Sequence, residues 1–311
     1  MRPTAILLQS QRFTKQLHSP LLKTIQIATS GTGHTRATLL ESQDASLKTP
    51  TVTYTLPSPE SRTQVSFQNE SNNSENLWIN IDTPPTGPSE QIQVSITIPQ
   101  HTILSRVSLE GTNSDLIIPT PPSKKFTSKI ETLFVNVNSG NTTLSSPSLS
   151  SLSSLQISTN HGFITLGKKV HSVTASLYTK LGDISGSLKK FSRVNAHTER
   201  GNVSLDLEPG LKQNETGVGS EIKATSGFGD VKLNVFGFSG NVVAQSSGQP
   251  VVKFLDAADK ALDLDDENST VLPRVERREV PGEVVAVVGE NGSGNILGQA
   301  EKGRLIVALG I

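Results

Sequence analysis

Apolar and polar residues alternate along much of the chain, which is the pattern of strands that bury one face. The clearest run extends from Ile92 to Ile98, where every second residue is isoleucine or valine and the residues between them are polar. Side chains two residues apart on a strand point to the same face, so this run predicts one buried and one wet face. Similar runs, separated by turns rich in Pro, Ser and Asn, occur at 52–56, 65–68 and 77–81.

A second pattern recurs at intervals of about twenty residues in the middle of the chain, and such a period is typical of repeat architectures. Most copies contain an apolar residue, a glycine, an Asn or Asp, and then a β-branched residue or leucine. Aligned on the glycine, with a serine in its place in the first copy, the copies fall at Ser114, Gly140, Gly162, Gly182, Gly201, Gly229 and Gly294. Apolar residues recur five residues before this position and two and four residues after it, which predicts stacked, buried columns.

These patterns predict an all-β fold. We expect a parallel β-helix, or solenoid, of about six or seven coils, in which each coil covers the apolar side of its neighbour. The glycine is expected at a corner that needs positive φ or close backbone approach. We also expect an N-terminal β-strand-rich cap and one short helix, over residues 254–264, where apolar residues follow helical spacing.

The expected organisation has five parts. No acidic residue precedes Glu41, whereas several basic residues do, which is the composition of a disordered or targeting leader. The predicted parts are a leader at 1–40, a β cap at 41–100, the solenoid at 101–250, a short helix and acidic loop at 251–275, and a C-terminal coil with closing strands at 276–311.

Composition narrows the classes of function. The 28 basic and 28 acidic residues balance, so no net field recruits nucleic acid. Cysteine is absent, which excludes disulfides, thiol nucleophiles and thiolate metal sites. No apolar run reaches the roughly 18 residues of a membrane span.

Three short phrases carry a resemblance to known proteins: Leu-Gly-Asp-Ile-Ser-Gly at 181–186, Arg-Gly-Asn-Val-Ser-Leu at 200–205 and Phe-Gly-Asp-Val-Lys-Leu at 228–233. Together with the strand at 94–99 and the phrase that follows at 107–116, they resemble adhesin-like β-solenoid domains of unknown function, including the autotransporter adhesin head domain. The resemblance covers about residues 90–250. It implies a non-enzymatic repeat domain linked to surfaces and adhesion, without catalytic residues to carry over.

Two columns of the repeat could carry chemistry. The residue after the glycine is acidic or an amide in most copies, as at Asp183, Asn202 and Asp230. Such a column could bind calcium, but Asn and Asp also favour corners, and we favour a structural ladder. A hydroxyl recurs three residues before the glycine, at Thr159, Thr179, Thr198 and Ser226. These hydroxyls could face a sugar or an ice-like lattice. We favour an internal ladder, because residues at these positions point to the same side of the strand as the residues expected to be buried.

Other candidates are weaker. The acidic run at 263–267 lacks the glycine and the final glutamate of a calcium-binding loop. The six histidines show no zinc-binding spacing. Lys168–Lys169 and Lys189–Lys190 fall at similar places in consecutive repeats and could form a small basic patch. We therefore predict no catalytic residues, no cofactor and no metal site.

The sequence favours a non-catalytic structural or adhesive module, of unknown ligand, at the cell surface. Its expected partner is a glycan or a protein surface, with neither nucleic acid nor a membrane span involved. One alternative is a carbohydrate-active β-helix enzyme, for which Asp183, Asp230, Lys180 and Arg200 are available without forming a cluster in the sequence. Another is an organellar scaffold, with a mitochondrial location, because of the acid-free first segment.

Overall fold

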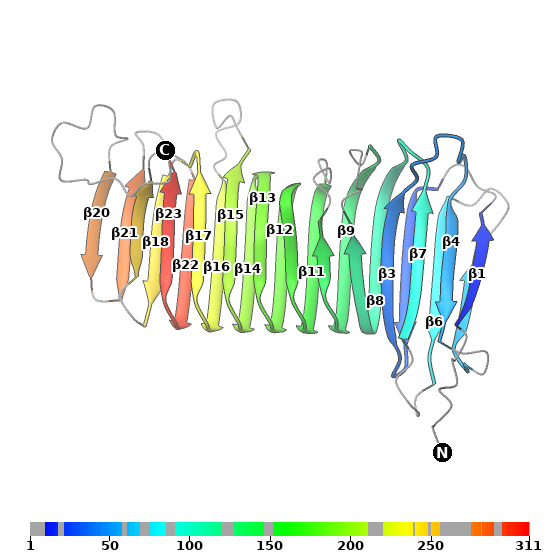
Figure 1. The fold of residues 1–311 in the computed structure, drawn as a ribbon. Coiled ribbons are helices and arrows are strands. Elements are labelled where there is room, and N and C mark those ends of the chain that lie inside the picture. The colour runs from blue at the N-terminus through cyan, green and yellow to red at the C-terminus, as the bar shows by residue number, and fades with distance from the viewer. Residues whose placement is uncertain are drawn as a thin grey trace, which may run out of the picture. The chain divides into compact units, whose positions relative to one another are not determined.

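The run from Ile92 to Ile98 forms strand β7 (Gln91–Ile98), and its alternate apolar residues are buried, as the pattern predicts. The computed structural model describes residues 10–17, 22–57, 61–68, 75–84, 91–119, 127–145, 152–210, 220–238, 240–247, 250–255, 275–280, 282–288 and 294–310. Within these ranges the protein is all-β and contains no helix (Figure 1).

The chain divides into two compact units, residues Met1–Ser146 and Pro147–Ile311. The division falls inside the segment 101–250 that was expected to form one solenoid. The strands of unit 1 are β1 (Gln11–Gln16), β2 (Thr24–Ser30), β3 (His34–Glu41), β4 (Thr51–Leu56), β5 (Gln64–Gln68), β6 (Asn76–Asp82), β7, β8 (Ile103–Ile118), β9 (Lys129–Ser139) and β10 (Thr142–Leu144).

The strands of unit 2 belong to two sheets, A and B. They are β11 (Leu152–His161), β12 (Ile164–Leu181), β13 (Ile184–Phe191), β14 (Arg193–Arg200), β15 (Val203–Pro209), β16 (Glu221–Phe228), β17 (Val231–Phe236), β18 (Gly240–Ser246), β19 (Val251–Leu255), β20 (Val275–Val280), β21 (Glu283–Val288), β22 (Gly294–Lys302) and β23 (Leu305–Gly310). The strands alternate between the two sheets from β13 to β19, whereas β20, β21 and β22 all belong to sheet B.

Unit 2 is built from strand pairs, each a strand of sheet B followed across a corner by a strand of sheet A. β14 and β15 form one pair, β16 and β17 the next, and equivalent strands lie parallel and in register. β12 is long enough to serve both sheets. From β11 to β17 the strands follow one another in the order of the sequence, and Figure 1 shows them side by side.

After β17 the spatial order departs from the sequence. The last strand pair, β22–β23, lies between β16–β17 and β18–β19, because β22 pairs with both β16 and β18, and β23 with both β17 and β19. β21 then pairs antiparallel with β18, and β20 antiparallel with β21. Sheet B of unit 2 therefore ends in antiparallel strands rather than in another parallel one.

Unit 1 shows the same departure in its first strands. β2 and β3 lie between the pair β6–β7 and the long strand β8. The antiparallel strands β5, β4 and β1 lie beyond β6–β7. Ile25 and Ile27 on β2, and Ala37 and Leu39 on β3, belong to the buried core. The expectation of a disordered or targeting leader at 1–40 is thus wrong for residues 24–40. The absence of acidic residues, on which that expectation was based, does not distinguish a leader from buried strands.

Corner glycines of unit 2 are aligned from one strand pair to the next. A Cβ atom on Gly182 would lie 2.0 Å from the carbonyl oxygen of Gly162, and one on Gly201 the same distance from that of Gly182. Both residues have positive φ, 150° and 155°. Only glycine fits this conformation and this approach, so the corner role predicted for it is confirmed.

The last corner is not where the sequence alignment places it. Gly303 follows Gly229 in the column, since a Cβ on Gly303 would lie 2.1 Å from the Gly229 carbonyl oxygen. Gly294 instead begins β22 and aligns with Gly240 on β18. The phrase Gly-Asn-Ile at 294–296 imitates the corner pattern, but it belongs to the strand that precedes the corner.

The apolar columns of the repeat form the core. Leu177, Ala196 and Ala224, five residues before the corner, are buried, and so are Ile184 and Val203 two residues after it. The short helix predicted over 254–264 is wrong where it can be compared, because residues 254 and 255 belong to β19. The remainder of that range, and the acidic run at 263–267, lie outside the described residues. The described part of the chain has no helix that could cross a membrane.

Candidate functional site

The acidic and amide column at the corners of unit 2 is a structural ladder. Asp183 Oδ1 accepts a hydrogen bond from the backbone N–H of Asn202 at 2.7 Å. Asn202 Oδ1 accepts one from Asp230 N–H at 2.9 Å, and Asp230 Oδ1 one from Arg304 N–H at 2.8 Å. Each side chain thus accepts a hydrogen bond from a backbone N–H of the next corner, where the hydrogen bonds between neighbouring strands are interrupted. This arrangement supports the ladder over the calcium alternative.

A corner of unit 1 uses the same device. Asp115 Oδ1 accepts a hydrogen bond from the backbone N–H of Asn141 at 2.7 Å, and its Oδ2 lies 3.0 Å from His34 Nε2. Asp115 is buried. No group of three or more metal-ligating side chains gathers among the residues that the structure describes.

The hydroxyl column faces inward. Thr179, Thr198 and Ser226 are buried, and each hydroxyl donates to the carbonyl oxygen of the preceding corner glycine, at distances of 2.8–3.0 Å. These hydroxyls therefore hold successive corners together. They are not available to a sugar or an ice-like lattice, so the internal ladder is confirmed.

Outward-facing residues of sheet A in unit 2 surround a hollow of about 570 Å³. This volume lies within the range of about 300–1,000 Å³ that is usual for small-ligand sites. Lys168 and Lys189, one from each of the two lysine pairs noted in the sequence, line this hollow together with Lys232. Lys190 is not part of it.

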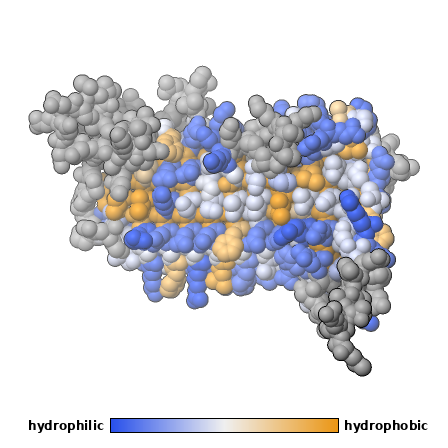
Figure 2. Space-filling view, viewed as in Figure 1, coloured by the Kyte–Doolittle hydropathy of each residue, from blue (hydrophilic) through white to orange (hydrophobic). Residues whose placement is uncertain are grey.

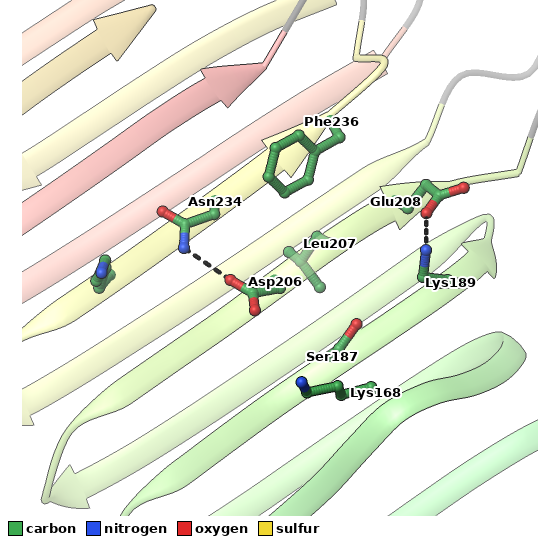
Figure 3. Close-up of a pocket in the computed structure, with 9 residues that line it drawn as sticks. Lys168, Ser187, Lys189, Asp206, Leu207, Glu208, Asn234 and Phe236 are labelled. Carbon is green, nitrogen blue, oxygen red and sulfur yellow. Dashed lines mark hydrogen bonds and ion pairs between the residues drawn. The ribbon is translucent and has the colours of Figure 1, made fainter. Parts of the chain in front are cut away.

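Acidic and amide side chains line the hollow together with these lysines (Figure 3). Lys189 forms an ion pair with Glu208. Asn234 Nδ2 donates a hydrogen bond to Asp206 Oδ1 at 2.7 Å. The basic patch expected from the sequence is therefore a mixed surface, in which one of the three lysines is already neutralised.

The hollow follows from the register of the strands. Positions five and seven residues after the corner glycine face outward, and they bring Ser187 and Asp206 into one row and Glu208 and Phe236 into another. The pairing of β12 with β13 is irregular between Leu166 and Val170, where Lys168 lies. Sequence reasoning missed the acids, Asn234 and Phe236, although counting from the aligned glycines would have placed them on one face.

Phe236 gives the hollow an apolar side. Its side chain is 39% exposed, and in Figure 3 its ring lies across from Ser187. An exposed aromatic ring beside hydrogen-bonding groups can pack against the apolar side of a ligand while the polar groups orient it.

The outer face of sheet B carries a second polar group. The rings of Tyr178 and His197 are stacked at 5.6 Å, and His197 Nδ1 lies 2.6 Å from Thr225 Oγ1. The Tyr178 hydroxyl donates to Glu199 Oε1 at 2.9 Å. Partial burial, and then the nearby Glu199 carboxylate, raise the pKa of Tyr178 above its usual value. Figure 2 shows that hydrophilic side chains are interspersed with separate apolar patches on the face in view.

Unit 1 contains another hollow, of about 640 Å³. Its lining comes mainly from the turns at 45–48 and 99–103 and includes Lys48 and His101. His101 has a positive φ of 59°, and Ile103 is one of the exposed large apolar residues. Lys23, at its rim, is paired with Glu75 at 2.7 Å.

The four residues that were available for a carbohydrate-active enzyme do not come together in one site. Asp183 and Asp230 belong to the corner ladder. Arg200 lies over the ring of Phe228, with 5.6 Å between guanidinium and ring centre, and Lys180 is exposed on β12. None of the four lines the hollow of sheet A.

No protein-family description matches the chain, and no curated protein matches it. It is similar to a "putative adhesin" of Bacteroides fragilis, with 12% identity, a TM-score of 0.39 and coverage of 97% of both chains. A "putative adhesin" of Parabacteroides distasonis gives 11% identity, a TM-score of 0.38 and the same coverage. For a "putative cell adhesion protein" of Clostridium sporogenes the values are 10% and 0.27, over 97% of this chain and 100% of the other. TM-scores below 0.5 do not establish a common fold, and no function is transferred from these structures.

Proposed function

We propose that this protein is a non-catalytic structural or adhesive module, built as a β-solenoid, that binds a partner at the cell surface through the outer faces of its sheets. Parallel, in-register strand pairs joined at aligned glycine corners are the arrangement of a solenoid. Within unit 2, the antiparallel strands β21 and β20 would then close one end of the parallel stack.

One observation carries the proposal. The recurring Asp, Asn, Thr and Ser side chains bond one corner to the next, so the chemically capable residues of the repeat maintain the stack. Acid–base catalysis on a sugar would need a pair of carboxylates converging on one bond. In the hollow of sheet A, Glu208 is paired with Lys189 and Asp206 accepts from Asn234. What remains is a surface suited to holding a ligand.

Binding and turnover of the same compounds test this proposal. The full chain would be applied to an array of glycans and cell-surface proteins, and every glycan that binds would then be incubated with it and analysed for shortened or unsaturated products. We expect retention without products. Depolymerisation of a bound glycan would contradict the non-catalytic role, and failure to bind any surface component would contradict the adhesive one.

The location has a separate test. Immunodetection on intact cells, before and after protease treatment, is expected to find the tagged full-length protein at the surface. Signal only in an internal compartment would contradict the cell-surface role, and signal in mitochondria would favour the scaffold alternative.

A further inference from the structure

The hollow on sheet A of unit 2 points to a ligand of particular charge. Lys168 and Lys232 line it from β12 and β17, and neither forms an ion pair or hydrogen bond with another described residue. Both side chains are exposed. Two ammonium groups without a neutralising partner attract anions, so charge complementarity favours a negatively charged ligand.

Strand spacing sets the size of this ligand. β12 and β17 are separated by β13 and β15, so these two strands are three spacings apart, about 14 Å at about 4.8 Å per strand, and the offset of Lys168 and Lys232 along the strands adds to the separation of the two lysines. A single phosphate or sulfate ion could contact only one of them. A ligand that uses both must be an oligomer that carries negative charges at intervals along its length.

The other groups that line the hollow indicate the chemistry of that oligomer. Asp206 and Glu208 present carboxylate oxygens, which accept hydrogen bonds from the hydroxyl groups of a sugar chain. Ser187 and Asn234 add a hydroxyl and an amide, and the exposed ring of Phe236 can cover the C–H face of a sugar. A phosphodiester chain has acceptors but no donors along its backbone, so it would meet the two carboxylates unfavourably.

We propose that this hollow binds an acidic glycan, a chain of sugar residues bearing carboxylate groups, with Lys168 and Lys232 contacting two of these groups and Phe236, four residues beyond Lys232 on β17, packing against a further sugar ring. This inference rests on the proposed function, because it names the ligand of an adhesive surface. Binding should weaken as salt increases, because the contacting lysines are exposed.

The test compares three probes on the full chain by titration calorimetry: oligogalacturonate, a neutral galactose oligomer of the same length, and oligothymidylate. The wild-type chain is expected to bind oligogalacturonate at least tenfold more tightly than either of the others. The double variant Lys168→Gln/Lys232→Gln, and separately Phe236→Ala, should each lose about tenfold or more in affinity. Lys223→Gln, an exposed change on the outer face of sheet B, is the matched control and should bind like the wild type.

The outcomes separate this inference from the proposed function. If the hollow variants bind oligogalacturonate as the wild type does, or if the neutral oligomer or oligothymidylate binds equally well, the inference is overturned while an adhesive role stands. Unchanged circular dichroism of each variant assigns any loss to the site rather than to folding. If the wild type shortens oligogalacturonate, the non-catalytic role fails, whatever the variants show.

Discussion

The two units use similar strand pairs, but unit 1 joins only some of them with the corner that unit 2 repeats. In unit 2 one kind of corner recurs, with a glycine, in most copies an Asx or arginine after it, and a hydroxyl or alanine three residues before it. In unit 1 the corner after β2 contains Gly31 and Gly33 and is tied by Thr83, whose hydroxyl donates to Ser30 O and accepts from Gly33 N–H. β8 passes through its own corner without ending. A repeat is legible in the sequence only where the same corner is used each time.

The two units also show two ways of ordering strand pairs in space. From β11 to β17 of unit 2, the four strand pairs lie in the order of the sequence, so a register error in one pair would displace the next. In both units, one strand pair is inserted out of sequence, and one parallel strand pair separates it from the antiparallel strands. Parallel strands with exposed edges can pair with other chains, and a change to antiparallel strands at the end limits how far a parallel stack extends.

The largest effect is expected in the core of unit 2. Ile184 is fully buried, and Ile184→Asp would place an unpaired carboxylate there, at a cost of at least about 4 kcal/mol. Lys180→Ala, on an exposed position, should change the free energy of unfolding by less than about 0.5 kcal/mol. Circular dichroism during heating measures both, and equal melting temperatures would refute the buried column.

The single tryptophan sharpens this experiment, because Trp78 lies on β6 in unit 1. Its fluorescence reports on unit 1, whereas circular dichroism reports on both units. We expect Ile184→Asp to shift the dichroism transition more than the Trp78 transition. Identical shifts in the two signals would show that the units unfold as one.

The corner glycine comes next. Gly182→Ala would place a Cβ atom 2.0 Å from the Gly162 carbonyl oxygen at positive φ, so the corner must distort at a cost of about 3 kcal/mol. At Gly210 the nearest atom to an added Cβ is 3.5 Å away, and Gly210→Ala should change stability by less than about 1 kcal/mol. Chemical denaturation compares the two, and similar midpoints would contradict the aligned corner.

The inner hydroxyl ladder should have a smaller effect. Thr198→Val keeps the shape of the side chain but leaves the buried carbonyl of Gly182 without its 3.0 Å partner, which we expect to cost about 1.5 kcal/mol. Thr165→Val, on the outer face of sheet A, is the control. No difference between these variants in urea unfolding would argue against the ladder.

In unit 1, a substitution at Thr142 is expected to increase the free energy of unfolding. Thr142 is buried two residues after a corner glycine, where unit 2 has isoleucine, valine or leucine, and its hydroxyl has no hydrogen-bond partner among the described residues. Thr142→Val removes this unsatisfied group and should stabilise unit 1 by about 1 kcal/mol. Thr143→Val, one residue along and facing the other way, should not. The Trp78 transition measures both, and a loss of stability at Thr142 would contradict the interpretation.

The smallest effect concerns Tyr178 in unit 2. Because its pKa is raised in the folded state, its proton is bound more tightly there than in the unfolded chain. The resulting stabilisation is present below about pH 10 and is lost as the pH rises through the folded pKa. In a Tyr54→Phe background, ultraviolet absorbance follows Tyr178 alone, and Glu199→Gln should lower its titration midpoint. An unchanged midpoint would remove Glu199 as a cause.

Local pattern alone determined the class of fold and much of the core. Alternation predicted β7, and the columns counted from Gly182 and Gly201 predicted which side chains are buried, because a corner and its flanking residues are close in the chain. The ladder of Asp183 and Asn202, and the inward hydroxyl of Thr198, followed from the same register. The aligned lysine pairs also pointed toward the hollow of sheet A.

Tertiary structure alone decided the order of the strand pairs at the ends, the final corner at Gly303 and the composition of the hollow. Backbone hydrogen bonds between strands are nearly independent of side-chain identity. The residues of β22 therefore do not indicate whether this strand pairs with β16 or with another parallel strand. For the same reason the residues at 24–40 were predicted to be a leader, although they belong to β2 and β3, which pair within unit 1. Asp206 and Glu208 on β15 meet Phe236 on β17 only because these two distant segments pair in register, and no neighbouring residue in the sequence indicates that pairing.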